Sequence, residues 1–395
     1  MTLDRARQGR WAVAACFFLN GLVMGSWVPQ IPLLVQRFEL NESALGLIIL
    51  TVGVGAVIAM PVCGWLMSRT SSREVLRVSA VLCAFALLLV AIAPSLLFVV
   101  PAVVFLGGAV GAMDVAMNAN AVAVERRLGT AIMSSSHGFW SLGGFTGAGL
   151  GGELAERLGH VGHAAVVTAA IVIVLAVALP RLIVEEQERA SSTEPHPGSG
   201  FPRQPGAYLI GFVALLCMMP EGAILDWAAL YLQQEMGASL SIASLAFTFF
   251  SGTMAVMRFL GDSVRNRLGA VATIRISGAI AAIGMLVAGS SPNATVAILA
   301  FALTGVGIAN MVPIVFSAAG NQPGVAPAIG MSIATTIGYS GILVAPSFIG
   351  FLAQHTGFSP IFIGFSGVLM LVVLFGRRME AADGQQAQAG SPAGA

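Results

Sequence analysis

The stretch EEQERASSTEPHPGSGFPRQPG, residues 185–206, lies near the middle of the 395-residue chain and combines charged residues with Pro, Gly and Ser. This composition is typical of a linker between folded parts. On both sides of it, apolar stretches of about 18 to 25 residues follow one another, and a helix of that length crosses a hydrocarbon core of about 30 Å. The linker therefore divides the chain into two halves of the same membrane-spanning character.

The composition supports a helical membrane protein with many spans. Hydrophobic residues make up 57% of the chain and charged residues 9%, and the mean hydropathy is +0.88, whereas a soluble domain has about 25% charged residues. The net charge of +1 gives no indication of a nucleic-acid partner. The cysteines lie inside apolar stretches without the spacing of metal ligands, so no metal site or disulfide framework is predicted.

Apolar periodicity and length predict twelve transmembrane helices. The start, MTLDRARQGRWAVAACFFLNGL, resembles a signal peptide, but its apolar run continues to about Leu34 and favours a retained first helix. The predicted spans are 11–34, 44–67, 76–94, 96–123, 132–155, 160–180, 206–233, 240–260, 270–289, 293–316, 327–353 and 358–376. The predicted domains are an N-terminal six-helix bundle (1–180), a cytoplasmic linker (181–205), a C-terminal six-helix bundle (206–378) and a disordered cytoplasmic tail (379–395).

The placement of arginine predicts the orientation, because loops rich in Arg stay on the cytoplasmic side. Nearly all arginines lie on the side of the termini and the linker. The opposite side has only Arg37 and Arg157, which stand beside several acidic residues. We therefore expect a multi-pass protein of a bacterial-type inner membrane with both termini in the cytoplasm.

The two halves resemble each other when one is shifted by about 194 to 200 residues. GSWVPQ, which contains Trp27, aligns with LDWAAL, which contains Trp227. GAMD, ending at Asp114, aligns with GIAN, ending at Asn310, and glycines of the fifth and eleventh spans align as well. A duplicated six-helix half is typical of secondary transporters that bind solute between the halves at mid-membrane.

With these features the chain resembles the major facilitator superfamily, which implies twelve helices in two pseudo-symmetric six-helix bundles. GWLMSRTSSR, residues 64–73, is similar to that superfamily's G-x-x-x-D-R-x-x-x-R loop, although Ser68 replaces its Asp. The copy in the second half, DSVRNR, keeps the acid. The resemblance implies that a gating loop contains Arg69, Arg73, Asp262 and Arg267.

Within the superfamily, MDVAMNANAV, residues 113–122, resembles the fourth helix of fucose-permease-like sugar/proton symporters. Together with MSSSHGFWSLGG and EGAILDWAALYL it is similar to the YbjJ-type bacterial inner-membrane proteins. GGFTGAGLGG, from Gly143, instead resembles the fifth helix of drug/proton antiporters, with Ala148 in place of a Pro. Glycine runs of this kind also let helix backbones approach closely.

Asp114 is the leading candidate for proton coupling, because a carboxylate at a helix centre costs about 2.5 to 3.5 kcal/mol on insertion scales. Burial disfavours its charged form, which suits a group that gains and loses a proton. Asn118 lies one turn further on the same face. The alternatives are a structural hydrogen bond from Asp114 to a neighbouring helix and direct solute binding without protonation.

Glu221 and Asp226 in the seventh span are the other proton-coupling candidates. They are five residues apart, about 140° on an ideal helix, so they face one solute only if the helix is interrupted. Pro220 and Gly222 make such an interruption plausible. The alternatives for Asp226 are an exterior gate and a hydrogen bond inside the bundle.

The substrate-binding candidates are aromatic, amide and imidazole side chains at helical spacing. His137 and Trp140 lie on one stripe of the fifth span, and an indole can stack on a sugar ring. Bundle packing and an interfacial position are the alternatives for the tryptophans and the histidine. The full set is Asn20, Trp27, Asn118, His137, Trp140, Trp227 and Asn310.

These features predict a secondary active transporter that works by alternating access, with protons and a small polar, sugar-like solute as partners in symport. A proton-coupled efflux antiporter of amphipathic drug-like compounds is the alternative. No nucleophile motif and no H-E-x-x-H motif is present, so an enzyme is not expected. The expected energy source is the proton gradient without a cofactor, and the protein is expected to act as a monomer in membrane lipid without a nucleic-acid partner.

Overall fold

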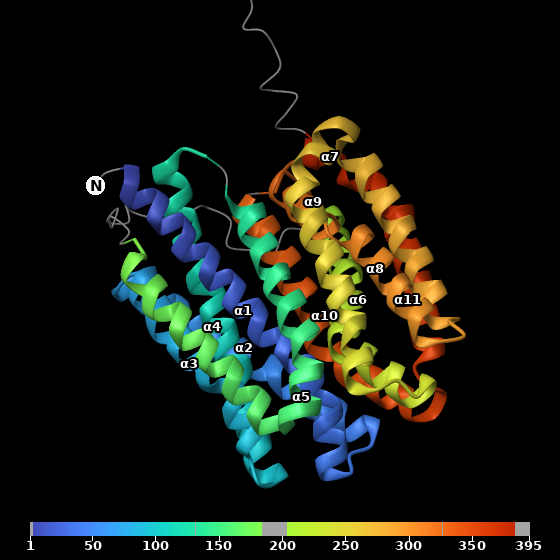
Figure 1. Ribbon diagram of the computed structural model, residues 1–395. Coiled ribbons are helices and arrows are strands. Elements are labelled where there is room, and N and C mark those ends of the chain that lie inside the picture. Colours follow the sequence, from blue (N-terminus) through green and yellow to red (C-terminus); the bar gives the residue numbers. More distant parts are fainter. Residues whose placement is uncertain (1–2, 131, 184–203, 326, 384–395) are drawn as a thin grey trace, which may run out of the picture.

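The computed structural model describes residues 3–130, 132–183, 204–325 and 327–383, and all regular structure in these residues is helical (Figure 1). The first half contains α1 (Leu3–Phe38), α2 (Glu42–Arg69), α3 (Ser72–Ile92), α4 (Leu96–Leu128), α5 (Met133–Ala178) and the 3-10 helix η1 (Leu179–Arg181). The second half contains α6 (Pro205–Met236), α7 (Leu240–Gly289), α8 (Ala294–Ile308), α9 (Met311–Gly320), α10 (Pro327–Thr356), α11 (Ser359–Phe375) and the 3-10 helix η2 (Gly376–Asp383).

The described chain contains 11 helical stretches that are long and apolar enough to cross a membrane. One of them, Ser135–Arg181, has 47 residues and bends at Gly159, where φ is 73°. Helix α7 bends in the same manner at Gly269, where φ is 76°, a conformation that glycine adopts without steric cost. With α5 counted as two spans, the twelve predicted crossings are confirmed.

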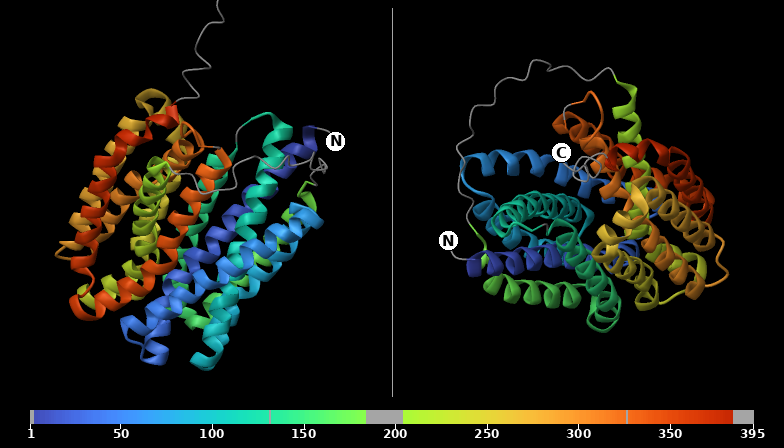
Figure 2. Two further views of the ribbon diagram at one scale, coloured as in Figure 1. Left: turned by 180° about the vertical axis from the view of Figure 1, so that it is seen from behind. Right: turned by 90° about the horizontal axis from the view of Figure 1, so that it is seen from above.

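The helices form two bundles, one from each half (Figures 1 and 2). In the first bundle α1 packs along α5 and α4 packs on α2 and α3; in the second, α7 packs on α8 and α11, and α6 packs on α10. The bundles meet along α5 and α7 and along α2 and α10. The predicted all-α membrane fold of two pseudo-symmetric bundles is therefore confirmed.

Glycine allows the closest helix contacts, as the glycine runs indicated. A Cβ at Gly143 of α5 would lie 2.0 Å from the carbonyl oxygen of Phe18 in α1, and one at Gly107 of α4 would lie 1.9 Å from that of Val52 in α2. No side chain fits at these distances. The segment 143–152, which resembles antiporters, therefore contains a glycine that the packing of α5 on α1 requires.

In each half, the segment that follows the last membrane-spanning helix is held by a similar pair of hydrogen bonds. In the first half, the Asn120 amide donates to Ser72 Oγ (2.9 Å) and to the carbonyl of Ile183 (3.0 Å). In the second half, Arg265 donates to Ser317 Oγ (3.0 Å) and to the carbonyl of Ala382 (2.6 Å). The duplication seen in the sequence thus extends to the ends of the halves.

Two predictions about local structure need correction. The tail was expected to be disordered from residue 379, but η2 continues to Asp383 and buries Met379 and Ala382, because these apolar side chains pack against α7 and α9. The rest of the tail and most of the linker lie outside the described residues. The predicted interruption of the seventh span is also wrong, because α6 is continuous through Pro220; the tenth span is interrupted instead, at Asn310 between α8 and α9.

Candidate functional site

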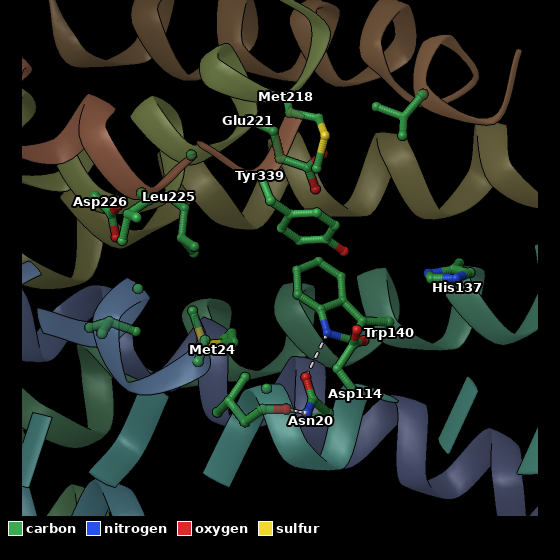
Figure 3. Close-up of a pocket in the computed structure, with 18 of the residues that line it drawn as sticks. Asn20, Met24, Asp114, His137, Trp140, Met218, Glu221, Leu225, Asp226 and Tyr339 are labelled. Carbon is green, nitrogen blue, oxygen red and sulfur yellow. Dashed lines mark hydrogen bonds between the residues drawn. The ribbon is translucent and has the colours of Figure 1, made fainter. Parts of the chain in front are cut away.

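A cavity of about 560 Å³ lies between the two bundles. Its walls come from α1, α2, α4 and α5 of the first half and from α6, α7, α9 and α10 of the second. Most of the lining is apolar. Its ionisable side chains are Asp114, His137, Glu221, Asp226, Arg258, Arg265 and Tyr339. Ten of the lining residues are labelled in Figure 3. All three predicted carboxylates therefore reach one cavity.

Asp114 faces the cavity from α4, and its polar contacts come from its own helix. The amide of Asn118, one turn further, donates to the Asp114 carbonyl (2.8 Å) and to its carboxylate Oδ1 (3.3 Å). Among the residues that the structure describes, no arginine or histidine forms a salt bridge with Asp114. A carboxylate in an apolar cavity without a counter-ion is most easily accommodated when it carries a proton.

Glu221, by contrast, is paired with a cation. Arg258 of α7 lies 3.5 Å from Glu221 of α6, and the two side chains are 14% and 22% exposed. Arg258 also donates to Ser141 Oγ of α5 (2.6 Å) and lies over the Trp140 ring, 6.0 Å from its centroid. This arginine of the second half therefore contacts the first half at two residues.

Asp226 lies at the other end of the cavity, with 8% of its surface exposed. It neighbours Trp27 of α1, which also lines the cavity and is fully buried. Figure 3 shows Asp226 and Glu221 apart from each other along α6. The continuous helix therefore presents its two carboxylates at different depths of the cavity instead of to one point.

Asn20, Trp140 and His137 line the first half's side of the cavity. The indole Nε1 of Trp140 donates to Asn20 Oδ1 (2.9 Å), and Asn20 Nδ2 donates to the carbonyl of Val110 in α4 (3.1 Å). His137 packs edge-on against Phe17, with ring centroids 5.1 Å apart. The predicted stripe on α5 thus faces the cavity.

Asn310 lines the opposite wall, at the interruption between α8 and α9. Its side chain packs on Gly261 of α7, where a Cβ would lie 2.2 Å from Asn310 Oδ1. Its amide Nδ2 is buried and has no partner within the described part of the chain. Within the described residues, Asn310 therefore brings a buried amide without a hydrogen-bond partner to the cavity wall.

Other predicted residues lie elsewhere. Trp227 is buried against Phe358, with ring centroids 5.5 Å apart, and does not line the cavity, so its interpretation as a solute contact is wrong. Asn118 contacts Asp114 and is not a lining residue. Arg69 stacks on Trp65 at 4.2 Å.

Arg73 and Arg267 do not line the cavity either. Arg73 is in α3, and Arg267 in α7 is exposed. The side chain of Asp262 lies outside the described side chains. The gating role of these residues stays a prediction.

Several cavity residues were not among the sequence candidates, and Arg258 and Tyr339 are two of them. Arg258 was assigned only to the arginine-rich side of the membrane, and Tyr339 of α10 lies in an apolar span without a neighbouring charge. In the structure the Tyr339 hydroxyl lies within electrostatic range of both Asp114 and Glu221 (Figure 3). The available signal for Arg258 was an arginine two residues inside the end of the predicted span 240–260.

Hydrogen bonds between the halves close the end of the molecule opposite the termini. Ser347 Oγ donates to the Gly46 carbonyl (3.2 Å), Gln234 to Glu42 (3.1 Å), the Ser241 backbone N–H to Glu156 (2.8 Å), and Ser43 to Gln354. Toward the other end, which holds Leu3 and Asp383, the bundles diverge (Figures 1 and 2). These hydrogen bonds between α2 and α10 thus lie at the end away from Leu3 and Asp383.

Two pseudo-symmetric helical bundles around one cavity define the class of solute transporters that work by alternating access. The family model described as Major Facilitator Superfamily matches residues 13–340 and, in a second match, residues 210–394. The chain belongs to the Major Facilitator Superfamily, which confirms the expectation of a transporter and not an enzyme. The finer resemblance to one branch stays a prediction.

Relatives and solved structures agree with this assignment. The chain is 37% identical to an uncharacterised MFS-type transporter of Yersinia pestis over 90% of this chain and 92% of that protein. It is 34% identical to the membrane protein MosC of Rhizobium meliloti over 88% and 84% of the two chains. The fold is similar to those of the nucleoside transporter NupG (TM-score 0.72, 13% identity, 94% and 98% covered) and a D-xylose-proton symporter (TM-score 0.72, 16% identity, 93% and 96% covered).

Proposed function

We propose that this transporter carries a small polar, sugar-like solute together with protons across a bacterial-type inner membrane, and that Asp114 carries the coupling proton. The observation that carries this proposal is the contrast between two cavity carboxylates. Glu221 has Arg258 as its counter-ion, whereas Asp114 has only the amide of Asn118. Asp226 also has no salt bridge in the described residues, but it lies at the end of the cavity beside Trp27. A carboxylate without a counter-ion in an apolar cavity can be neutralised by a proton and recharged when the cavity opens to water.

The proposed orientation places both termini in the cytoplasm, because the arginine-rich loops lie at their end of the molecule. The divergence of the bundles toward that end then corresponds to an inward-open state. Binding of solute and proton would let the bundles rock until the cavity faces the other side of the membrane. The solved relatives whose names include a nucleoside or D-xylose and proton symport support a hydrophilic solute.

The test uses purified protein in weakly buffered liposomes that contain a pH-sensitive dye. Neutral sugars, sugar acids, nucleosides and lipophilic cations are added outside in turn, and internal pH is followed for wild type and Asp114→Asn. We expect internal acidification on adding a hydrophilic solute, lost in Asp114→Asn. Glu153→Gln is the matched control, since Glu153 is a surface carboxylate paired with Arg157.

Two results contradict the proposal. Internal alkalinisation on adding an amphipathic cation indicates proton-coupled efflux, the alternative function. Solute-driven acidification that persists in Asp114→Asn but disappears in Glu221→Gln or Asp226→Asn assigns the coupling proton to another cavity carboxylate.

A further inference from the structure

Asn20 has its polar atoms engaged before any solute arrives. Its Oδ1 accepts the Trp140 indole N–H at 2.9 Å, its Nδ2 donates to the Val110 carbonyl at 3.1 Å, and the residue is 1% exposed. A buried amide bonded in this way has little left to offer a solute. Its contribution is to hold the Trp140 ring in one orientation on the cavity wall.

A second contact restrains the same ring. The Arg258 guanidinium lies over Trp140, 6.0 Å from the ring centroid, and is itself held by Ser141 (2.6 Å). A cation near an aromatic face is attracted to it. Trp140 is therefore fixed at its N–H by α1 and at its ring by α7, which reduces the entropy lost when a solute packs on it.

Tyr339 provides an aromatic surface from the other half. It is on α10, lines the cavity and is 43% exposed. Figure 3 draws Tyr339, Trp140 and Asp114 among the residues that line this cavity. In the described part of the chain the two rings form no ring contact with each other, and both residues line the cavity.

Aromatic faces favour solutes with a compact C–H face, and a saturated sugar or cyclitol ring has one. An open-chain polyol with similar hydroxyl groups has no fixed face and loses more rotational freedom on binding. We infer that Trp140 and Tyr339, one from each half, select cyclic over open-chain solutes, and that Asn20 is the positioning residue for Trp140. This inference rests on the proposed function, because it assumes a hydrophilic solute in the same cavity.

The first test measures equilibrium binding to purified protein by tryptophan emission, without a pH gradient. The probes are two pairs, D-xylose with xylitol and D-glucose with sorbitol. We expect at least one cyclic probe to bind about tenfold or more tightly than its open-chain partner. Trp140→Leu is expected to abolish that preference, while Trp227→Phe, which changes a tryptophan outside the cavity, retains it.

The second test separates positioning by Asn20 from general packing. We expect Asn20→Leu to weaken binding of the cyclic probe about tenfold in the wild-type background. In a Trp140→Phe background it should change binding less than twofold, since Phe has no N–H to orient. Asn20→Ser, whose hydroxyl is too short to replace the amide, serves the same comparison if Asn20→Leu does not fold.

Three results overturn the inference: equal affinity for ring and open-chain partners, no binding of either cyclic probe, or an Asn20→Leu effect of the same size in both backgrounds. The outcome is independent of proton coupling because no gradient is present. A failure of Asp114→Asn to abolish acidification would refute the proposed coupling and leave ring selection intact.

Discussion

Arg258 is a cavity residue that joins the two halves. Its guanidinium contacts Glu221 of its own half and Ser141 and Trp140 of the other. Because these side chains are mostly buried, removing one partner leaves a charge poorly compensated. Arg258 therefore contributes to stability and to the geometry of the solute site together.

We predict that Glu221→Gln and Arg258→Gln each lower the free energy of unfolding by about 1 to 3 kcal/mol, and that the double variant loses less than their sum. The physical reason is that the double variant leaves neither charge without its partner. Thermal unfolding of the four proteins in detergent measures this coupling. Strictly additive losses would show that the pair at 3.5 Å contributes no net stability.

At the scale of elements, the contact of α1 with α5 depends on the absence of side chains. The Cβ of an alanine at Gly143 would lie 2.0 Å from the Phe18 carbonyl, and one at Gly21 would lie 1.9 Å from that of Trp140. Backbone atoms cannot move aside without separating the helices. Gly21 of α1 packs against the turn of α5 that contains Trp140, and this contact helps to determine where Trp140 lies in the cavity.

We predict that Gly143→Ala lowers the thermal stability strongly and reduces transport, because α5 must move away from α1. Gly364→Ala in α11 is the matched control, since a Cβ there meets nothing within 4 Å. Stability in detergent and solute flux in liposomes are measured for both. Equal behaviour of the two variants would contradict the packing model.

The junction at the end of the second half supports a prediction about the tail. Truncation after Gly376 removes the buried Met379 and the Ala382 carbonyl that accepts from Arg265 at 2.6 Å. A buried apolar side chain contributes about 1.5 to 3 kcal/mol, and a hydrogen bond to a charged donor contributes about as much. We expect the melting temperature to fall by several degrees, whereas truncation after Asp383 leaves it unchanged.

At the scale of the whole molecule, the state seen here depends on contacts at the closed end. Ser43 of α2 donates to Gln354 of α10, and Ser347 of α10 donates to the Gly46 carbonyl of α2. Alternating access requires these bonds between the halves to break when the cavity opens on that side. A covalent link at this place should hold the molecule in one state.

We predict that the double variant Ser43→Cys/Gln354→Cys loses transport on oxidation and recovers it on reduction. The four native cysteines are buried, so they offer no competing accessible thiol. Each single variant serves as the control and should transport equally in both conditions. Full transport by the oxidised double variant, with the cross-link shown by mass spectrometry, would mean that this end does not have to open.

Much of this protein could be predicted from its sequence. The twelve spans depend on local apolar length, and the duplication depends on order along the chain. Asp114 stood out because a charge inside an apolar helix is costly wherever the helix packs. Trp227 does not line the cavity, because repeat symmetry matches positions along the chain but does not determine which side chains, such as Phe358, pack around each copy.

Tertiary structure alone decided which groups share the cavity and how they pair. Ser141 and Arg258 are 117 residues apart, and Asn20 and Trp140 are 120 apart, so no local pattern relates them. Among the described residues, the pairing of Glu221 with Arg258 leaves Asp114 and Asp226 as the cavity carboxylates without a salt bridge. The sequence by itself determined the membrane fold and the presence of buried acids, because these follow from local transfer energies; the packing of distant helices determined their partners.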